Sequence, residues 1–417
     1  MNRTDRERVG GRAGGRRSGP FVALLLPWIA ACGGGERGPG PVARMRDSAD
    51  VRIVENMEPA TRLQLSPGRA SAAPEEGVEP AFRLTSIVAL GDSVVVVANT
   101  GGHSIDAYDG SGALLWRTGR EGKGPGEFEG DLRVFRYRGD SLLAYDWSLR
   151  RLTVLDGGGE PVRTATLSNA EPNPDVMGTL ADGSIIVGSR HLSLGLGLHA
   201  DSTVIALHSP EGARLRELTS LPMEPVCMTY VNRVPVIDTQ PMAGIASIAA
   251  RGDGLVIARG VQPRVESLAA TGTLRRISRW PQPVDAVTPE LRQRWIDWDN
   301  ATLADRNPFG DVARSPEIRE RWQATAVFPD STPRTRQIAF DGEGNLWVML
   351  WTPPWERRSA WNVFDPEGRW LAGIELPVAV RRFAAGTGFL ATIETDSLDV
   401  EHVRGYPVTL RAQSGGL

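Results

Sequence analysis

The sequence predicts an all-β fold built from six similar four-stranded units. Three observations lead to this prediction. A tight glycine-containing turn followed by a run of apolar residues recurs six times along the 417-residue chain. The first and second turns are 48 residues apart, the second and third 43, and the fifth and sixth 44. This period is typical of four-stranded units. Finally, 47 glycines and 30 prolines favour short strands joined by turns over long helices.

The recurring turn marks the first hairpin of each unit. Several units carry a second turn with glycine at its end, such as Asp109–Gly112 and Asp156–Gly159. Apolar and polar residues alternate on both sides of these turns, as in half-buried antiparallel strands. We therefore expect a six-bladed β-propeller over residues 51–412, with four antiparallel strands in each blade. The six first turns are Gly91-Asp92-Ser93, Gly139-Asp140-Ser141, Asp182-Gly183-Ser184, Gly252-Asp253-Gly254, Gly342-Glu343-Gly344 and Gly386-Thr387-Gly388.

The sixth unit ends before it can form an outer strand. A ring with one incomplete blade leaves strand edges open to pairing with other chains. Val51–Asn56 has the alternation of a strand and lies outside any unit. We expect this segment to supply the missing outer strand of blade six.

Two intervals are longer than the repeat. The fourth and fifth turns are 90 residues apart, and Thr288-Pro289-Glu290 and Ser315-Pro316-Glu317 between them are helix-start signals. These signals predict a helical insertion over residues 286–336, between blades four and five. The proline-rich segment 221–243, between blades three and four, is expected to be an ordered loop.

The first forty residues resemble an export signal. Six arginines precede the apolar run 21–31, which is too short to span a bilayer stably and is typical of a secretory signal peptide. Ile29-Ala30-Ala31-Cys32 resembles the lipobox of bacterial lipoproteins, which implies cleavage of residues 1–31 and acylation of Cys32. A plain signal peptide with an incidental cysteine is the alternative. Residues 32–50 would then form a flexible tether.

The lipobox resemblance also bears on location. Gly33 is not the aspartate that would signal inner-membrane retention, so we expect a lipid anchor in the outer membrane of a bacterial cell envelope. Cys227, the second of two cysteines, is expected to be a buried, inert thiol.

The glycine-rich stretch Gly119–Phe128, GREGKGPGEF, resembles the inter-blade signature of bacterial six-bladed β-propeller lipoproteins related to the NHL-repeat group. This resemblance implies the fold and export, but no reaction, because propellers host lyases, lactonases and passive binding modules alike. A phosphate loop is disfavoured, because Pro125 lacks a backbone donor and no Gly-Lys-Ser/Thr follows. Phe128 is expected to be a packing residue.

Composition and motifs exclude several classes of function. A formal charge of −3 argues against nucleic acid as the main partner. No H-E-x-x-H, C-x-x-C or G-x-S-x-G motif is present, so zinc, redox and serine-hydrolase sites are not predicted. No cofactor or metal is expected. The five histidines fall in different blades and are His103, His191, His199, His208 and His402.

The starts of the inner strands carry the first candidate site. The residues expected there are Arg83, Arg133, Met177, Ile245, Arg336 and Arg382. Several arginines around one end of the propeller axis would suit an anionic ligand, because guanidinium groups bind carboxylates and phosphates in a bidentate manner. The alternative is that these arginines lie on exposed blade edges.

Aromatic residues give the second candidate site. Nine of the twelve tryptophans lie between Trp280 and Trp370. They either form a lid that stacks on sugar rings or a hydrophobic ligand, or they hold the insertion against blade five. Trp295 and Trp298 lie on one helical face. Trp351 and Trp355 are the two rings expected to be exposed and to bind ligand.

These features favour a lipid-anchored binding or scaffold module that presents one propeller face to a small ligand, a glycan or a protein partner of the envelope. Two alternatives remain. One is a metal-dependent hydrolase or lyase of the lactonase type, with a divalent cation such as calcium at the axis. The other is an assembly role in which the tryptophan-rich insertion contacts another protein.

Overall fold

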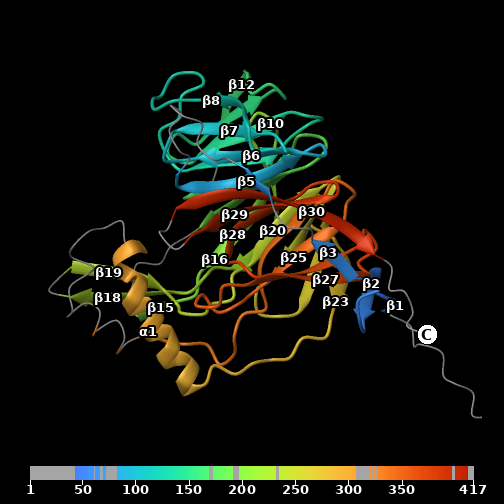
Figure 1. Cartoon of the computed structure of the whole chain (residues 1–417), viewed down its shortest axis with the longest axis vertical. Helices are drawn as coiled ribbons and strands as arrows, with labels where there is room; N and C mark the ends of the chain where they lie inside the picture. The colour runs from blue at the N-terminus through green and yellow to red at the C-terminus, as the bar shows by residue number, and fades with distance from the viewer. Residues whose placement is uncertain are drawn as a thin grey trace, which may run out of the picture. The chain divides into compact units, whose positions relative to one another are not determined.

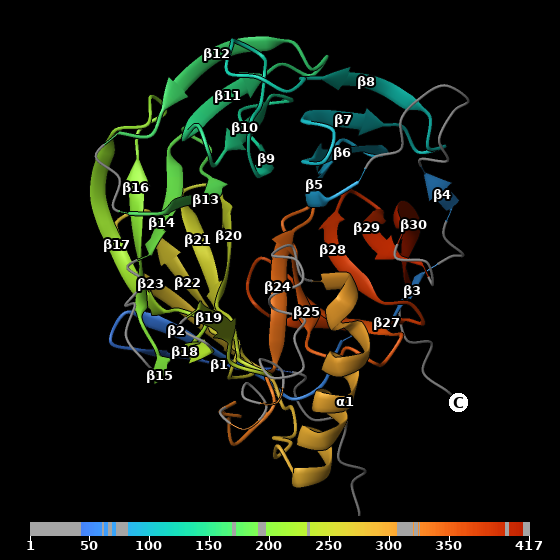
Figure 2. The same ribbon diagram turned by 90° about the vertical axis from the view of Figure 1, so that its left-hand side faces the viewer.

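The computed structural model describes residues 43–60, 62–65, 69–71, 82–168, 172–190, 197–231, 234–306, 320, 324, 326–396 and 400–411. Residues 41–417 form one compact unit. Strand pairing within this unit confirms the predicted fold, because six four-stranded antiparallel blades follow one another along the chain. The first strand of each blade lies nearest a common axis (Figure 2).

The first three blades have these strands. Blade one contains β5 (Leu84–Leu90), β6 (Val94–Asn99), β7 (Ser104–Tyr108) and β8 (Leu114–Thr118). Blade two contains β9 (Leu132–Arg136), β10 (Leu142–Asp146), β11 (Arg151–Leu155) and β12 (Pro161–Thr166). Blade three contains β13 (Pro174–Thr179), β14 (Ile185–Arg190), β16 (Ser202–His208) and β17 (Arg214–Pro222).

The last three blades complete the ring. Blade four contains β20 (Ser247–Arg251), β21 (Gly254–Ala258), β22 (Arg264–Ala269) and β23 (Leu274–Arg279). Blade five contains β24 (Thr335–Phe340), β25 (Leu346–Leu350), β26 (Ser359–Phe364) and β27 (Trp370–Leu376). Blade six contains β28 (Val380–Ala385), β29 (Phe389–Thr395), β30 (Glu401–Arg411) and β3 (Arg62–Leu65).

The hydrophobic core is divided into six layers, one between each pair of neighbouring blades. Buried residues of blades one and two form one cluster, and the same holds for every following pair. Leu84 and Val97 of blade one pack with Ile393 and Val403 of blade six, which closes the series. Each sheet is therefore buried on both faces, and its stability depends on both neighbours.

An N-terminal strand completes blade six, but it is not the one expected. β3 pairs antiparallel with β30, with Leu63 opposite Leu410, and β4 (Arg69–Ser71) pairs with the same strand. The prediction that Val51–Asn56 closes blade six is wrong. This segment is β2, and it lies parallel to β23 on the outer edge of blade four. β1 (Ala43–Ser48) pairs antiparallel with β2. β1 therefore forms a strand within residues 32–50, the segment expected to be a flexible tether.

Asn56, at the end of β2, explains this placement. Its Nδ2 donates to the carbonyl oxygens of Arg279 at 3.0 Å and Gly368 at 3.1 Å, and its Oδ1 accepts from the backbone nitrogen of Trp370 at 2.8 Å. The side chain is buried and joins the outer strands of blades four and five. Strand alternation alone does not distinguish one open sheet edge from another, whereas these three hydrogen bonds do.

The insertions differ in part from expectation. α1 (Pro289–Arg306) lies within the predicted helical insertion, between blades four and five. The second expected helix start, at Ser315, lies outside the described residues. Segment 221–243 is not only a loop, because it contains β18 (Val226–Val231) and β19 (Val234–Thr239), which form a sheet with β15 (Gly197–His199). Two β-branched runs separated by two residues are a hairpin signal.

The glycine-rich stretch packs between blades one and two, as predicted for a turn between blades. Phe128 is fully buried in the core layer of these blades. Gly119 has a φ of 110°, and a Cβ there would lie 2.6 Å from the Phe128 ring. Both the backbone conformation and the space require glycine. The expectation that Phe128 is a packing residue is confirmed.

We predict that Asn56→Ala lowers the free energy of unfolding by about 2–4 kcal/mol, because it leaves two buried carbonyl groups and one backbone N–H without their partner. Equilibrium denaturation in urea measures this change. Met57→Ala is the control, because Met57 is 44% exposed and its truncation should change stability by less than about 0.5 kcal/mol. Equal effects of the two substitutions would contradict the role given to Asn56.

Candidate functional site

The two faces of the ring are built from different connections. Loops between the second and third strands of a blade, and loops between blades, lie on one face, which we call the loop face. The tight hairpin turns lie on the opposite face, which we call the turn face. α1 and the sheet of β15, β18 and β19 belong to such loops, and they lie on one side of the ring in Figure 1 and in front of it in Figure 2.

The predicted arginines lie at the loop-face ends of the inner strands. Arg133 is on β9, Arg336 on β24 and Arg382 on β28, while Arg83 precedes β5. Figure 2 shows these strands around the axis. Arg382 Nε donates to the carbonyl oxygen of Thr85 at 3.4 Å, and Arg336 Nη1 donates to that of Val380 at 3.2 Å. Arg382 thus contacts blade one from blade six, and Arg336 contacts blade six from blade five.

These arginines and Arg381 form one electrostatic group. Burial, and after it the positive charges of Arg133, Arg336 and Arg381, lower the pKa of Arg382 to about 10, against a smaller opposing effect of Asp175. Burial also lowers the pKa of Arg336, with a contribution from Arg381. Both Arg336 and Arg382 are nevertheless reached by solvent. We call Arg133, Arg336, Arg381 and Arg382 the arginine cluster.

Acidic residues pair with part of this group. Arg133 Nε lies 2.8 Å from Asp175 Oδ1, and Arg381 contacts Glu401. Outside the cluster, Arg83 lies 3.3 Å from Asp131. Burial raises the pKa of the Asp175 carboxyl, and Arg133 opposes this rise.

Arg336 and Arg382 have no carboxylate partner among the described residues. The acceptors that the structure gives their guanidinium groups are backbone carbonyl oxygens. Two positive charges therefore stand together on the inner strands without a directly paired carboxylate, and Asp175 offsets only part of the effect on Arg382. Such an arrangement can bind an anion, because charge-assisted hydrogen bonds to a carboxylate or phosphate would satisfy the remaining N–H donors.

Backbone irregularity also gathers at the loop face. Four inner strands have a shift in register near their loop-face ends, and one of these bulges includes Arg336. Bulges of this kind redirect side chains. Five of the seven described non-glycine residues with positive φ lie in loop-face loops, namely Arg83, His103, Arg150, Asn173 and Met242. Strained backbone of this type gathers at functional sites.

The other predicted site residues are placed differently. Met177 is on β13, and Ile245 lies in the loop before β20, 45% exposed. Trp351 and Trp355 are half-buried, so the expectation that they are exposed is wrong. Trp355 is covered by α1, because its ring lies 6.4 Å from that of Trp295 and 5.0 Å from the Arg294 guanidinium.

The tryptophans mainly hold the structure together. Trp295 and Trp298 of α1 are in contact, with ring centroids 5.2 Å apart. Trp280, Trp347 and Trp361 are buried in the layers that flank blade five. Of the two interpretations of the tryptophan cluster, these contacts favour the one in which the rings fix the insertion to blade five.

A divalent cation does not fit the arginine cluster. Its side chains carry positive charge, and Asp175, the carboxylate beside them, is already paired with Arg133. Within the described residues, no group of three histidine, cysteine, aspartate or glutamate side chains is arranged to hold a metal ion. Cys32 and His191 lie outside the described residues, and Cys227 is on β18, so its burial stays a prediction. The expectation that the histidines fall in different blades is wrong, because His199 lies between the second and third strands of blade three and His208 on the third strand.

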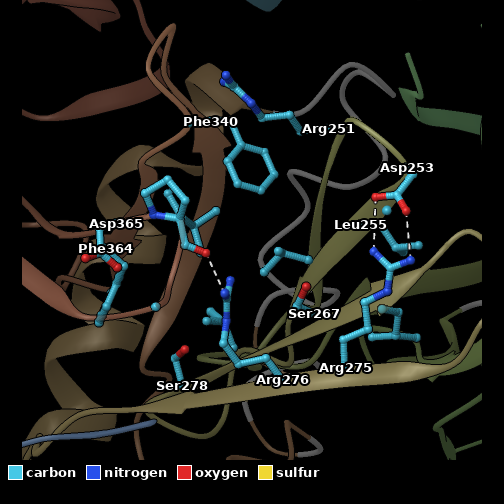
Figure 3. Close-up of a pocket in the computed structure, with 18 of the residues that line it drawn as sticks. Arg251, Asp253, Leu255, Ser267, Arg275, Arg276, Ser278, Phe340, Phe364 and Asp365 are labelled. Atoms are coloured by element: carbon cyan, nitrogen blue, oxygen red, sulfur yellow. Dashed lines mark hydrogen bonds and ion pairs between the residues drawn. The ribbon is translucent and has the colours of Figure 1, made fainter. Parts of the chain in front are cut away.

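A pocket of about 430 Å³ opens between blades four and five on the turn face (Figure 3). Arg276 donates to the carbonyl oxygen of Pro366 across it, and Arg251 donates to that of Gly342 at 3.1 Å. On its blade-four side, Arg275 pairs with Asp253 at 2.8 Å.

The Arg276 contact repeats in other blades. Arg163 reaches Pro210 O at 3.0 Å and Arg216 reaches Ala270 O at 2.8 Å. All three arginines are the third residue of an outer strand and bind a hairpin turn of the next blade. That position in the repeat is the signal by which the sequence could have revealed them, and it marks Arg276 as a structural contact.

No protein-family model and no curated protein matches the chain. Solved structures resemble it at low identity. A Bacteroides fragilis protein inferred to be exported has 10% identity and a TM-score of 0.46, covering 86% of this chain and 99% of its own. Virginiamycin B lyase from Staphylococcus aureus has 9% identity and a TM-score of 0.42, covering 83% and 99%.

The calcium-binding protein regucalcin from Agrobacterium tumefaciens has 12% identity and a TM-score of 0.40, covering 83% and 95%. At such values, the activities of these proteins do not bear on this chain, and its six blades are established by its own strand pairing. In the described part of the chain, α1 is not apolar enough to cross a membrane.

We predict that Arg382→Gln raises the free energy of unfolding by up to about 1 kcal/mol, allowing for screening by solvent. The pKa of Arg382 is about 10 in the folded protein, below its ordinary 12.5. Folding therefore disfavours the charged form, and this penalty is relieved only as the pH rises above about 10. Denaturation should show the same gain at about pH 6 and about pH 9.

Arg275→Gln is the matched control on the turn face. The hydrogen bonds of Arg275 to Asp253 raise the pKa of Arg275. Replacing Arg275 should therefore not increase the free energy of unfolding. A loss of stability on substituting Arg382 would contradict the description of an uncompensated cluster.

Proposed function

We propose that this protein is an envelope binding module whose arginine cluster takes up a ligand that carries carboxylate or phosphate groups. The single observation that carries the proposal is the pair Arg336 and Arg382, two neighbouring guanidinium groups without a carboxylate partner among the described residues. Their pKa values are lowered first by burial and then by neighbouring arginine charges. An anion of the ligand would offset this effect.

The geometry suits selective binding. The two arginines come from adjacent blades five and six, and each donates one N–H to a backbone carbonyl oxygen, which fixes its orientation. Preorganised donors lose little conformational entropy when a ligand binds. Asp175 lies beside Arg133 and would repel a second anionic group. The site should therefore favour a ligand whose charge is concentrated at one end.

Catalysis by a metal ion is the weaker candidate. A lactonase-type hydrolase or lyase needs several acidic or imidazole ligands around one cation, whereas the described residues at this end of the axis are mainly arginines. A glycan or a lipid would also be a ligand of the proposed binding module, provided that it carries an anionic group.

The proposed location rests on the first residues of the sequence. The resemblance of Ile29–Cys32 to a lipobox supports acylation of Cys32, and the resemblance of Gly119–Phe128 to the signature of propeller lipoproteins supports export. A lipid anchor on Cys32 would hold the propeller at a membrane surface. We propose the outer membrane as its site.

We predict that the mature protein binds inorganic phosphate or acetate, and that Arg382→Gln or Arg336→Gln weakens this binding at least about tenfold, the loss expected for one charge-assisted hydrogen bond. Titration calorimetry measures the affinity. Arg275→Gln, on the turn face, should bind as the wild type does. Binding of neither anion, or equal binding by all three variants, would reject the proposed site.

We also predict that Cys32→Ser moves the full-length protein from the membrane fraction to the soluble envelope fraction, because one residue would carry all the acyl chains. Fractionation and intact-mass measurement test this. Cys227→Ser is the control and should change neither. An unchanged distribution of the Cys32 variant would reject the lipid anchor.

A further inference from the structure

Exposed apolar side chains are concentrated on the loop face. Of the fourteen large hydrophobic side chains that are exposed among the described residues, nine belong to loop-face connections and none belongs to a hairpin turn of the turn face. The other five lie on outer strands or on the N-terminal ribbon of β1 and β2. Exposed apolar residues scattered over a surface need no explanation, whereas their concentration on one face marks an interaction site.

Several of these side chains flank the arginines. Phe82, 50% exposed, directly precedes Arg83. Trp147, 44% exposed, donates its backbone N–H to Asp131 O at 3.1 Å, next to the strand that carries Arg133.

On the opposite side of the axis, Ile245 is 45% and Val261 54% exposed. Both lie in loops of blade four, beside the blade that carries Arg336. These apolar side chains thus belong to loop-face connections of three blades, namely one, two and four.

The loops that carry these apolar side chains are hydrogen-bonded to neighbouring loops. Gly101 donates its backbone N–H to Phe82 O at 3.0 Å. Arg334 donates its backbone N–H to the carbonyl oxygen of Gly260, next to Val261, at 2.6 Å. Arg334 itself is buried. These contacts cross from one loop to another, so the apolar side chains are presented by fixed loops. A fixed apolar surface loses little entropy when a partner binds.

We propose that the loop face binds an acidic, amphipathic segment of another protein, which places a carboxylate on Arg336 and Arg382 and apolar side chains on Phe82, Trp147, Ile245 and Val261. This inference rests on the proposed function and names its ligand class. A small anion would satisfy the arginines but would leave the surrounding apolar side chains in water. A polypeptide segment carries both kinds of group at the spacing that such a face requires.

A lipid bilayer fits this face less well. α1 and the sheet of β15, β18 and β19 lie in front of the ring (Figure 2), so a flat surface would meet these insertions before it reached the inner strands. A peptide chain can pass between the insertions and enter the arginine cluster.

Selection from a library of random peptides about twelve residues long, displayed on phage and panned against the mature protein, tests this inference. We expect selected sequences to be enriched in aspartate or glutamate next to leucine, phenylalanine or tryptophan. A synthetic copy of a selected peptide should bind at least about tenfold more weakly to Arg382→Gln and to the double variant Ile245→Ser, Val261→Ser.

Phosphate binding separates this inference from the proposed function. The serine variants should bind phosphate as the wild type does, whereas Arg382→Gln should lose it. Leu115→Ser, Val162→Ser and Leu215→Ser, which remove exposed side chains of outer strands, are the matched controls and should bind the peptide normally.

Three results would overturn the inference. Phosphate binding without any enriched acidic peptide would leave the proposed function intact and reject the peptide ligand. Equal peptide binding by the loop-face serine variants and the outer-strand controls would reject the apolar contact. Co-sedimentation with vesicles of anionic lipid that depends on Ile245 and Val261, with no peptide enriched, would assign the face to a membrane instead.

Discussion

Every blade of this protein depends on burial against two neighbours. The six core layers lie between blades and none lies within a blade. A sheet of four strands with both faces apolar is not stable in water unless both faces are covered. The ring must therefore close, and closure pairs an N-terminal strand, β3, with the last strand, β30. The loops, the insertions and the arginine cluster take their positions from the closed ring.

The closed ring has two faces that differ in structure. On the turn face, arginines on three outer strands bind the hairpin turns of the next blade and hold the blades in register. The loop face has longer connections, both insertions, most of the non-glycine residues with positive φ and most of the exposed apolar side chains. A rigid ring can tolerate such strain on one face because stability is supplied by the layers between the blades.

The arginine cluster shows how a repeat architecture creates a site. Arg133, Arg336 and Arg382 occupy related positions on three different inner strands, and only the ring brings them near one another. Burial and the neighbouring positive charges lower the pKa of Arg382, so folding disfavours its charged form, as at many sites where stability is traded for binding. Asp175 pairs with Arg133 and Glu401 with Arg381, whereas Arg336 and Arg382 are the two residues that we propose to bind an anion.

The sequence by itself determined the number of blades, the strand order within each blade and the position of the helical insertion, because turn residues and alternation act locally. It also indicated which arginines begin the inner strands. Only the tertiary structure decided that β2 joins blade four and β3 closes blade six, because open strand edges look alike until Asn56 meets Arg279, Gly368 and Trp370. The burial of Trp355 under α1 and the lack of carboxylate partners for Arg336 and Arg382 were likewise decided there, since both depend on residues far apart in the chain.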